Sequence, residues 1–324
     1  MTDQQQASQY TAALLRIEQA AVRAVVADYL YRMAMMRRQA RGAVVLRGAE
    51  TAAQTIAREL EAQAGDLIDG RRIERAADLY AAQAVDLATG YAGAAASLEP
   101  DPVAAHAMQA AIATAEDKLR VGVKLLQQAE TPVAIESALK VATAAAANIA
   151  TGAEYSVNVA ANAAIWHTAA REGARLIWRD ERDACVVCLA LAGHTVDPSE
   201  GEAFDEFATF DPTHSPTPVW PPGMPLTYPP RHPHCRCWVE VWRGSAAGLV
   251  DLSQALRREA LRSALRGWSL PSESNAARLR AAEHVLRSGL ADSMPKSVRA
   301  EGERAVGRGR FTTRSWPHRG STIG

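Results

Sequence analysis

Residues 229–242, Pro-Pro-Arg-His-Pro-His-Cys-Arg-Cys-Trp-Val-Glu-Val-Trp, join a close cysteine pair to a short alternation of apolar and polar side chains. The alternation over Cys237–Trp242 is typical of a strand. An earlier run, Ala174–Trp178, is also rich in aliphatic and aromatic residues, as strands commonly are. We expect the two runs to form paired strands at the two ends of the intervening segment.

All four cysteines of the chain lie at the ends of that segment. Cys185 and Cys188 form a CxxC pair before it, Cys235 and Cys237 form a CxC pair after it, and 46 residues separate the pairs. A CxxC pair on a tight turn can bind one tetrahedral zinc ion, and a second pair supplies the other two ligands. The spacing therefore predicts a closed, structural zinc site that joins the ends of the loop.

Other arrangements of these residues remain open. His234, with His232 as a neighbouring competitor, could replace one thiolate, because neutral imidazole is an ordinary zinc ligand. The cysteines could also bind no metal, or a disulfide could join Cys188 and Cys235 in an assembled particle. The CxC spacing needs a turn or kink, because two side chains on one face of a regular strand lie too far apart for easy chelation. Pro233 is placed to provide it.

Ten of the sixteen prolines lie in the segment between the two predicted strands. Proline interrupts both helices and sheet ladders, so we expect an irregular loop there. The loop also carries acidic residues, namely Asp197, Glu200, Glu202, Asp205, Glu206 and Asp211. We interpret it as a solvated excursion, with an inserted partner-binding loop as the alternative.

The region before the cysteines has the pattern of alanine-rich amphipathic helices, and its first 99 residues contain no proline. The expected helices cover residues 6–40, 49–96 with a break between Gly65 and Gly70, 103–129, 132–149 and 151–173. Asp101 and Thr131, each followed by proline, are predicted caps of the third and fourth of these. We weigh an ordinary bundle equally against a surface for self-association or partner docking.

The C-terminal region is basic, with 15 Lys and Arg against 7 Asp and Glu from Val241 onward. An amphipathic pattern predicts a helix over residues 251–268, and a second helix capped by Ser272 and ending before Gly289. We therefore expect a helical pair after the cysteine module.

From Lys296 onward, a basic and glycine-containing composition predicts a flexible tail. Phe311 and Trp316 are its only aromatic residues that could stack on bases. The tail is thus a candidate for weak, non-specific contact with DNA, and a solvated tail is the alternative.

Composition supports a mainly α fold, because apolar residues make up 48% of the 324 residues and aromatic residues only 6%. The expected domains are an alanine-rich helical domain over 1–172, a small α+β zinc-stapled module over 173–243, and a basic helical segment with its tail over 244–324. The formal net charge is zero, so the basic C-terminal part is balanced by the rest of the chain.

The sequence carries no signal for export or for the common hydrolases. It begins MTDQQQASQY, without the basic and apolar regions of a signal peptide, and we find no uncharged apolar run of about 18 residues. We expect a soluble protein made in the cytosol, with no membrane partner. The H-x-E element of zinc deaminases, HExxH, Walker A, GxGxxG and GxSxG are all absent from the sequence, so we expect no enzyme.

The residues around the cysteines resemble the phage Mu F-like head morphogenesis module. The resemblance rests on Trp178, Asp183, Cys185, Cys188, Gly193-His194, Phe204 and the run from Pro229 to Cys237, whose HPHCRC ending is the most distinctive part. It covers about residues 173–242, and the long acidic loop departs from a minimal module.

This resemblance implies a minor capsid protein of a tailed double-stranded DNA phage. Such a protein would be present in few copies near the portal vertex of the virion head, and in the host cytoplasm during assembly. Its partners would be portal, capsid or scaffold proteins, and it would act in procapsid assembly or in DNA packaging and delivery. The alternatives are a capsid maturation protease or other zinc-containing phage hydrolase, and a cytosolic zinc-bearing interaction protein unrelated to phages.

Overall fold

The computed structural model is mainly helical with a small three-stranded sheet. It describes residues 3–93, 101–180, 186–204, 227–230, 235–242, 247–267 and 274–311. The chain divides into two compact units, residues 1–161 and 162–324, called here the first and the second unit. The domain boundaries expected from the sequence remain predictions.

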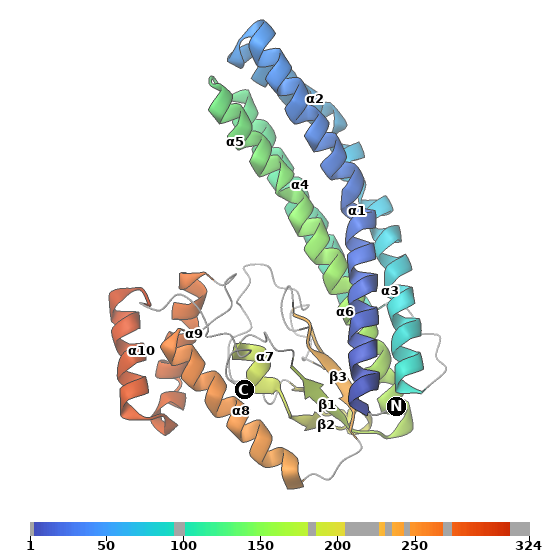
Figure 1. Cartoon of the computed structure of the whole chain (residues 1–324), viewed down its shortest axis with the longest axis vertical. Helices are drawn as coiled ribbons and strands as arrows, with labels where there is room; N and C mark the ends of the chain where they lie inside the picture. Colours follow the sequence, from blue (N-terminus) through green and yellow to red (C-terminus); the bar gives the residue numbers. More distant parts are fainter. Residues whose placement is uncertain are drawn as a thin grey trace. The chain divides into compact units, whose positions relative to one another are not determined.

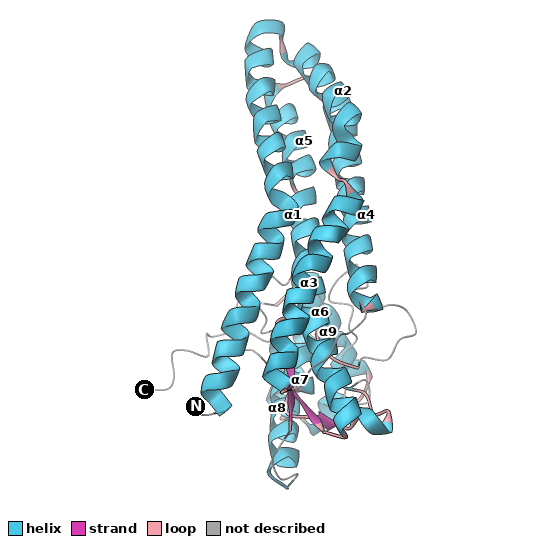
Figure 2. Cartoon of the chain, turned by 90° about the vertical axis from the view of Figure 1, so that its right-hand side faces the viewer, coloured by secondary structure: helices cyan, strands magenta, loops and turns pink. Residues whose placement is uncertain are grey.

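The first unit consists of long helices that pack side by side (Figure 1). They are α1 (Asp3–Arg47), α2 (Ala49–Leu67), α3 (Gly70–Ala92), α4 (Pro102–Gln127), α5 (Pro132–Thr143) and α6 (Ala145–Glu172), whose last part belongs to the second unit. Helix α1 packs against α2 along one half and against α3 along the other, while α4 packs on α2 and α5. The chain thus doubles back on itself, as Figure 2 shows in cyan.

Small side chains let these helices approach closely. A Cβ atom added at Gly122 of α4 would lie 2.7 Å from the Cβ of Ala142 on α5, and one at Gly152 of α6 would lie 2.5 Å from the Cβ of Ala111 on α4. The Tyr29 hydroxyl donates a 2.6 Å hydrogen bond to the Ala142 carbonyl. The alanine-rich composition therefore becomes close helix packing rather than a core of large side chains.

Most of the expected helical pattern of this unit is confirmed. The chain breaks between α2 and α3 at Ile68 and Asp69, within the predicted interval. The side chain of Asp101 accepts a hydrogen bond from the Val103 amide, and that of Thr131 from the Ala134 amide, as N-caps do.

The predicted boundary between residues 149 and 151 is wrong. Helix α5 ends at Thr143 and α6 runs through position 151 without interruption. Thr151 does not cap a helix, because its hydroxyl donates 2.9 Å to the carbonyl of Ala147 one turn earlier. A threonine within a helix satisfies its hydroxyl in this way, so it need not mark a helix start.

The second unit contains an antiparallel sheet of order β2-β1-β3. Its strands are β1 (Leu176–Arg179), β2 (Thr195–Val196) and β3 (Trp238–Val241). The predicted pairing of the two hydrophobic runs is confirmed, because Trp178 lies opposite Val239. The expectation of an unbroken irregular loop is wrong for its first part, which forms α7 (Val186–Leu191), β2 and a 3-10 turn at Pro198–Glu200. Proline starts that turn, where its missing N–H is not needed.

The C-terminal region forms α8 (Ala247–Arg266), α9 (Asn275–Arg287), a 3-10 turn at Leu290–Ser293 and α10 (Lys296–Arg308). The flexible tail expected from Lys296 is therefore wrong up to Phe311. Val298, Gly302 and Ala305 are buried on α10, and a Cβ added at Gly302 would lie 2.8 Å from Leu265 of α8. Packing of this small-residue face outweighs the basic composition.

The start of α9 also differs from the expectation. Its N-cap is Ser274, whose hydroxyl accepts from the Ala277 amide, whereas Ser272 lies outside the described residues. The predicted break after α9 is confirmed by the left-handed conformation of Gly289. Trp316 also lies outside the described residues.

One helical stretch of the described chain, Pro132–Glu172, is long and apolar enough to cross a membrane by length and composition alone. The sequence pattern did not indicate it, because we looked for a run of apolar residues without any charged residue. Asn158 donates a 2.6 Å hydrogen bond to Glu18 from this stretch, and Ser156 donates to the carbonyl of Ala104. These buried polar groups are satisfied by the protein itself, as in an interior helix, so the stretch is weak evidence for a membrane span.

Candidate metal centre

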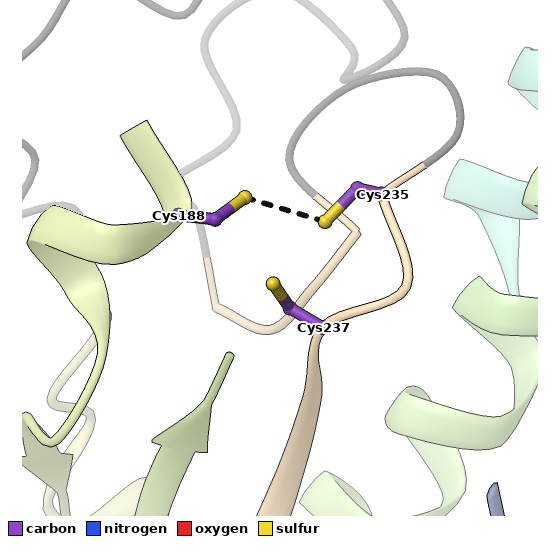
Figure 3. Close-up of side chains that lie close together, drawn as sticks. All are labelled: Cys188, Cys235 and Cys237. Atoms are coloured by element: carbon purple, nitrogen blue, oxygen red, sulfur yellow. Dashed lines mark hydrogen bonds between the residues drawn. The ribbon is translucent and has the colours of Figure 1, made fainter. Parts of the chain in front are cut away.

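Three cysteine side chains come together in the second unit. Cys188 lies in the first turn of α7, and Cys235 and Cys237 lie in the irregular segment just before β3. Their Sγ atoms all lie within 4.8 Å of one another, and those of Cys188 and Cys235 are 3.4 Å apart. All three point toward a common centre (Figure 3) and at most 4% of each is exposed. Residues 47 positions apart in sequence thus meet at one buried point.

Strand pairing explains why the sulfur atoms meet. Arg179, the last residue of β1, lies opposite Trp238, the first residue of β3. Because the two strands are antiparallel, the end of β1 and the start of β3, which follows Cys237, lie at the same end of the pair. The backbone of Trp178 bonds to the turn after α7, accepting from the Gly193 amide and donating to the His194 carbonyl at 3.0 Å each. Both cysteine-bearing segments are therefore tied to the same strand.

Besides its pairing with β1, β3 is bonded to an asparagine on α6. Asn162 is fully buried, and its Oδ1 accepts a 2.9 Å hydrogen bond from the Val239 amide. Val239 is the second residue of β3, two positions after Cys237. A buried amide without a partner costs free energy, so this bond favours one position of the start of β3 relative to α6.

Aromatic side chains join β1, α6 and the long loop. Trp178 is fully buried and meets the ring of Phe204 edge-on, with centroids 5.1 Å apart. Trp166 of α6 lies 6.4 Å from Phe204 and 5.9 Å from Tyr228 by centroid distance. Edge-to-face aromatic contacts of this kind bury large areas at defined geometry. They secure the loop on both sides of its undescribed part.

His194 lies just after α7 and is not part of the sulfur cluster. Burial, and then the charge of Arg257 on α8, lower its pKa below the ordinary value, and a hydrogen bond to the backbone of Ala190 opposes this. The neutral imidazole is therefore favoured. Its backbone carbonyl, bonded to Trp178, is the part that orders the site.

The geometry suits a thiolate-bound metal ion. Zinc binds thiolate sulfur at about 2.3 Å in tetrahedral sites, which places ligand sulfurs roughly 3.8 Å apart. The sulfur atoms of Cys188 and Cys235 are 3.4 Å apart and all three lie within 4.8 Å of one another, a range that includes this value. The disulfide considered for Cys188 and Cys235 is not formed in this structure, because a disulfide bond is about 2.05 Å long.

The structure tests only part of the predicted ligand set. Cys188, Cys235 and Cys237 are brought together and could bind a metal ion. Cys185, His232 and His234 lie outside the described residues, so the identity of a fourth ligand stays a prediction. Cys235–Cys237 lie before the regular strand and not in it, and the kink expected at the CxC pair stays a prediction. Cys188, however, lies in a helical turn and not in the tight turn that we expected.

Sequence reasoning missed the supporting residues Asn162, Trp166 and Tyr228. Asn162 offered a usable signal, because it interrupts an alanine-rich helical stretch in which a polar side chain needs a buried partner. For Trp166 and Tyr228, the sequence held no signal other than the large size of their side chains. Of the residues that carried the family resemblance, Trp178, Phe204 and the three cysteines lie in one neighbourhood, whereas Asp183 is outside the described residues.

A comparison of the chain with known protein families, with curated proteins and with solved structures finds no match.

Proposed function

We propose that the cysteine cluster binds one structural zinc ion, and that the chain is a minor capsid or head morphogenesis protein of a tailed double-stranded DNA phage. The observation that carries the first part is the convergence of three buried thiols from the two ends of one long loop. The second part rests on the resemblance of these same residues to the Mu F-like module.

Zinc is favoured over other ions by the ligand chemistry. Soft thiolates select zinc, copper(I) or iron–sulfur clusters over magnesium and calcium, and zinc is the commonest occupant of sites with three or four cysteines. Burial of every described ligand favours a structural role, since catalytic zinc needs an accessible position for water. Cys185, or else His234, is the proposed fourth ligand.

The proposed role of the ion is to close the module around its loop. By joining α7 to the start of β3, the ion would supply stability that a larger hydrophobic core would otherwise provide. A module fixed in this way would suit a virion component that docks on portal, capsid or scaffold proteins, in the head near the portal vertex, after assembly in the host cytoplasm. The long helices of the first unit are the proposed surface for docking or self-association.

The zinc proposal is tested by metal analysis of the reduced, purified chain. We expect about one zinc per chain in the wild type and none in Cys188→Ser with Cys235→Ser, because a tetrahedral site loses half its ligands. Leu189→Ala in α7 is the matched control, because Leu189 is buried beside Cys188 but has no ligand atom. It should destabilise the module and keep the zinc. A wild type without zinc, or equal loss in both variants, contradicts the proposal.

The assignment to phage heads needs a separate experiment. Particles produced from the genomic region that encodes the chain would be purified on a density gradient and analysed by quantitative mass spectrometry. We expect the chain in few copies per head, together with portal protein. A chain found only outside particles, or one that cleaves capsid or scaffold proteins when purified, would overturn the assignment.

A further inference from the structure

The ends of the three C-terminal helices meet at one place in the second unit. The side chain of Asn275, at the start of α9, donates 3.1 Å to the carbonyl of Gly309 after α10, and accepts from the Phe311 amide at 3.3 Å. Arg278 donates 3.2 Å to the carbonyl of Gly267 after α8. Gly267 has a φ of +64°, and a Cβ there would lie 2.2 Å from the Phe311 ring. We call this junction of Gly267, Asn275 and Gly309–Phe311 the convergent end.

Six arginines lie close to the convergent end along the chain. They are Arg266, Arg278, Arg280, Arg304, Arg308 and Arg310. Each lies within five residues of a junction residue along its own helix, or about 8 Å at the helical rise of 1.5 Å per residue. The contacts that join the three helix ends therefore gather these charges at one end of the small bundle.

Several of these charges are available to a partner. Arg266 pairs with Glu301 at 3.3 Å, and Arg278 lies over the Phe311 ring at 6.0 Å from its centroid. Arg280, Arg304 and Arg310 are exposed and form no ion pair with a described residue. Arg308, one turn after Arg304, is also exposed, and its Nε donates only to the Arg304 carbonyl.

The excess of positive charge extends over all three helices. Residues 247–267 and 274–311 hold twelve Lys and Arg against six Asp and Glu, whereas residues 1–161 hold fifteen against eighteen. Such segregation within a neutral chain creates a local positive potential that attracts polyanions. Arginine supplies eleven of the twelve cations, and its planar fork matches phosphate oxygens.

The surroundings favour a phosphate backbone over an acidic protein. The large apolar residues that are exposed in the described chain are Leu15, Leu30, Tyr31, Val45, Leu46, Leu79, Val121, Leu125 and Val133, all in the first unit. A protein interface normally has an apolar or aromatic centre, which the convergent end lacks among its described residues. Single-stranded nucleic acid needs stacking platforms, and Phe311 is already packed against Gly267 and Arg278.

We propose that the convergent end of α8–α10 binds the phosphate backbone of duplex nucleic acid without sequence preference. The binding surface is an ordered helical one, and not the flexible tail that the composition suggested. This inference goes beyond the proposed zinc site and capsid role, and it does not depend on either. Phosphate contacts of this type release counterions, so affinity should fall steeply with salt.

Fluorescence anisotropy of the full chain with a labelled duplex of about 30 base pairs, between roughly 50 and 200 mM NaCl, tests the proposal. Arg304→Gln with Arg308→Gln should weaken binding about 10- to 50-fold near 0.1 M salt and reduce the salt slope by about 2. Arg38→Gln with Arg47→Gln is the matched control, because both residues are exposed on α1 and the charge change is identical. It should weaken binding less than about threefold, because neither residue belongs to the proposed surface and salt screens the effect of charge outside it. Circular dichroism should show unchanged helix content in both variants.

Binding of other polyanions distinguishes which partner carries the phosphate groups. Duplex DNA and duplex RNA of equal length should both bind, and their relative affinity identifies the preferred duplex. Tighter binding of single strands or of polyglutamate would overturn the proposal in favour of another partner class. Equal weakening by the two double arginine variants, or no measurable duplex binding by the wild type, would also overturn it. The same holds if removal of residues 312–324 abolishes binding while Arg304→Gln with Arg308→Gln leaves binding unchanged.

Discussion

The first unit and the cysteine module of the second unit are stabilised in opposite ways. In the first unit, long helices contact one another through many small side chains, and alanines are buried along α2, α3, α4 and α6. In the module, short strands lie next to three buried thiols and are held by one asparagine and a few aromatic rings. In the first unit, the stabilising free energy is spread over many small contacts, whereas in the module it depends on a few residues. Single substitutions should therefore act mildly on one and severely on the other, except where helices are in closest contact.

The largest effect is expected from Trp178→Ala. Truncating a fully buried aromatic residue should lower the free energy of unfolding of the second unit by about 3–5 kcal/mol, because it leaves a cavity beside Phe204. Hydrogen exchange followed by mass spectrometry should show faster exchange in β1 and β3 but not in α1–α5. Tyr31→Ala, at an exposed aromatic residue of α1, is the control and should change stability by less than about 0.5 kcal/mol. Equal effects would refute the contrast.

Gly122→Ala is the exception that tests close packing in the first unit. The new Cβ would lie 2.7 Å from that of Ala142, and the overlap should destabilise the unit by about 1–3 kcal/mol in chemical denaturation. Gly42→Ala provides the comparison, since no neighbouring atom lies within 4 Å of its added Cβ. That substitution in α1 should stabilise the helix by about 0.5–1 kcal/mol. The same sign for both would show that the α4–α5 contact is looser than described.

Asn162→Ala tests the single polar anchor of β3. Loss of the acceptor leaves the buried Val239 amide without this partner and should cost about 1–3 kcal/mol. The direct readout is hydrogen exchange at the Val239 amide, which should become faster. Thr114→Ala removes a hydroxyl that bonds only within α4, and should leave that amide unchanged. An unchanged Val239 amide in Asn162→Ala would mean that strand pairing alone positions the site.

The smallest effect is expected from Asp101→Ala at the start of α4. The substitution removes the side-chain acceptor of the Val103 amide and should destabilise the first unit by about 1 kcal/mol. Asp101→Ser should restore most of the lost stability, because serine is also a good N-cap. Thermal unfolding followed by circular dichroism measures both variants. A failure of serine to rescue would indicate that the negative charge, and not the cap bond, matters at this position.

The two regions also differ in how far the sequence predicted them. In the first unit, the cap residues Asp101 and Thr131 and the break near Gly65 and Gly70 were read correctly, because capping and helix propensity act within a few residues. The boundary near Thr151 was missed because a threonine hydroxyl can bond to its own helix as readily as it caps a new one. In the module, the two main strands and the cysteine pairs were predicted, but Asn162 and the Trp166–Tyr228 contact were not.

The sequence by itself determined the mainly helical class, the two strand-forming hydrophobic runs and the segregation of charge, because each depends on composition or local spacing. Only the tertiary structure decided that Asn162 bonds to Val239, that Trp166 contacts Tyr228, and that α10 is a packed helix. These outcomes depend on which distant surfaces bury one another. The free energy of such burial is a property of the pair of surfaces, so neither segment carries it alone.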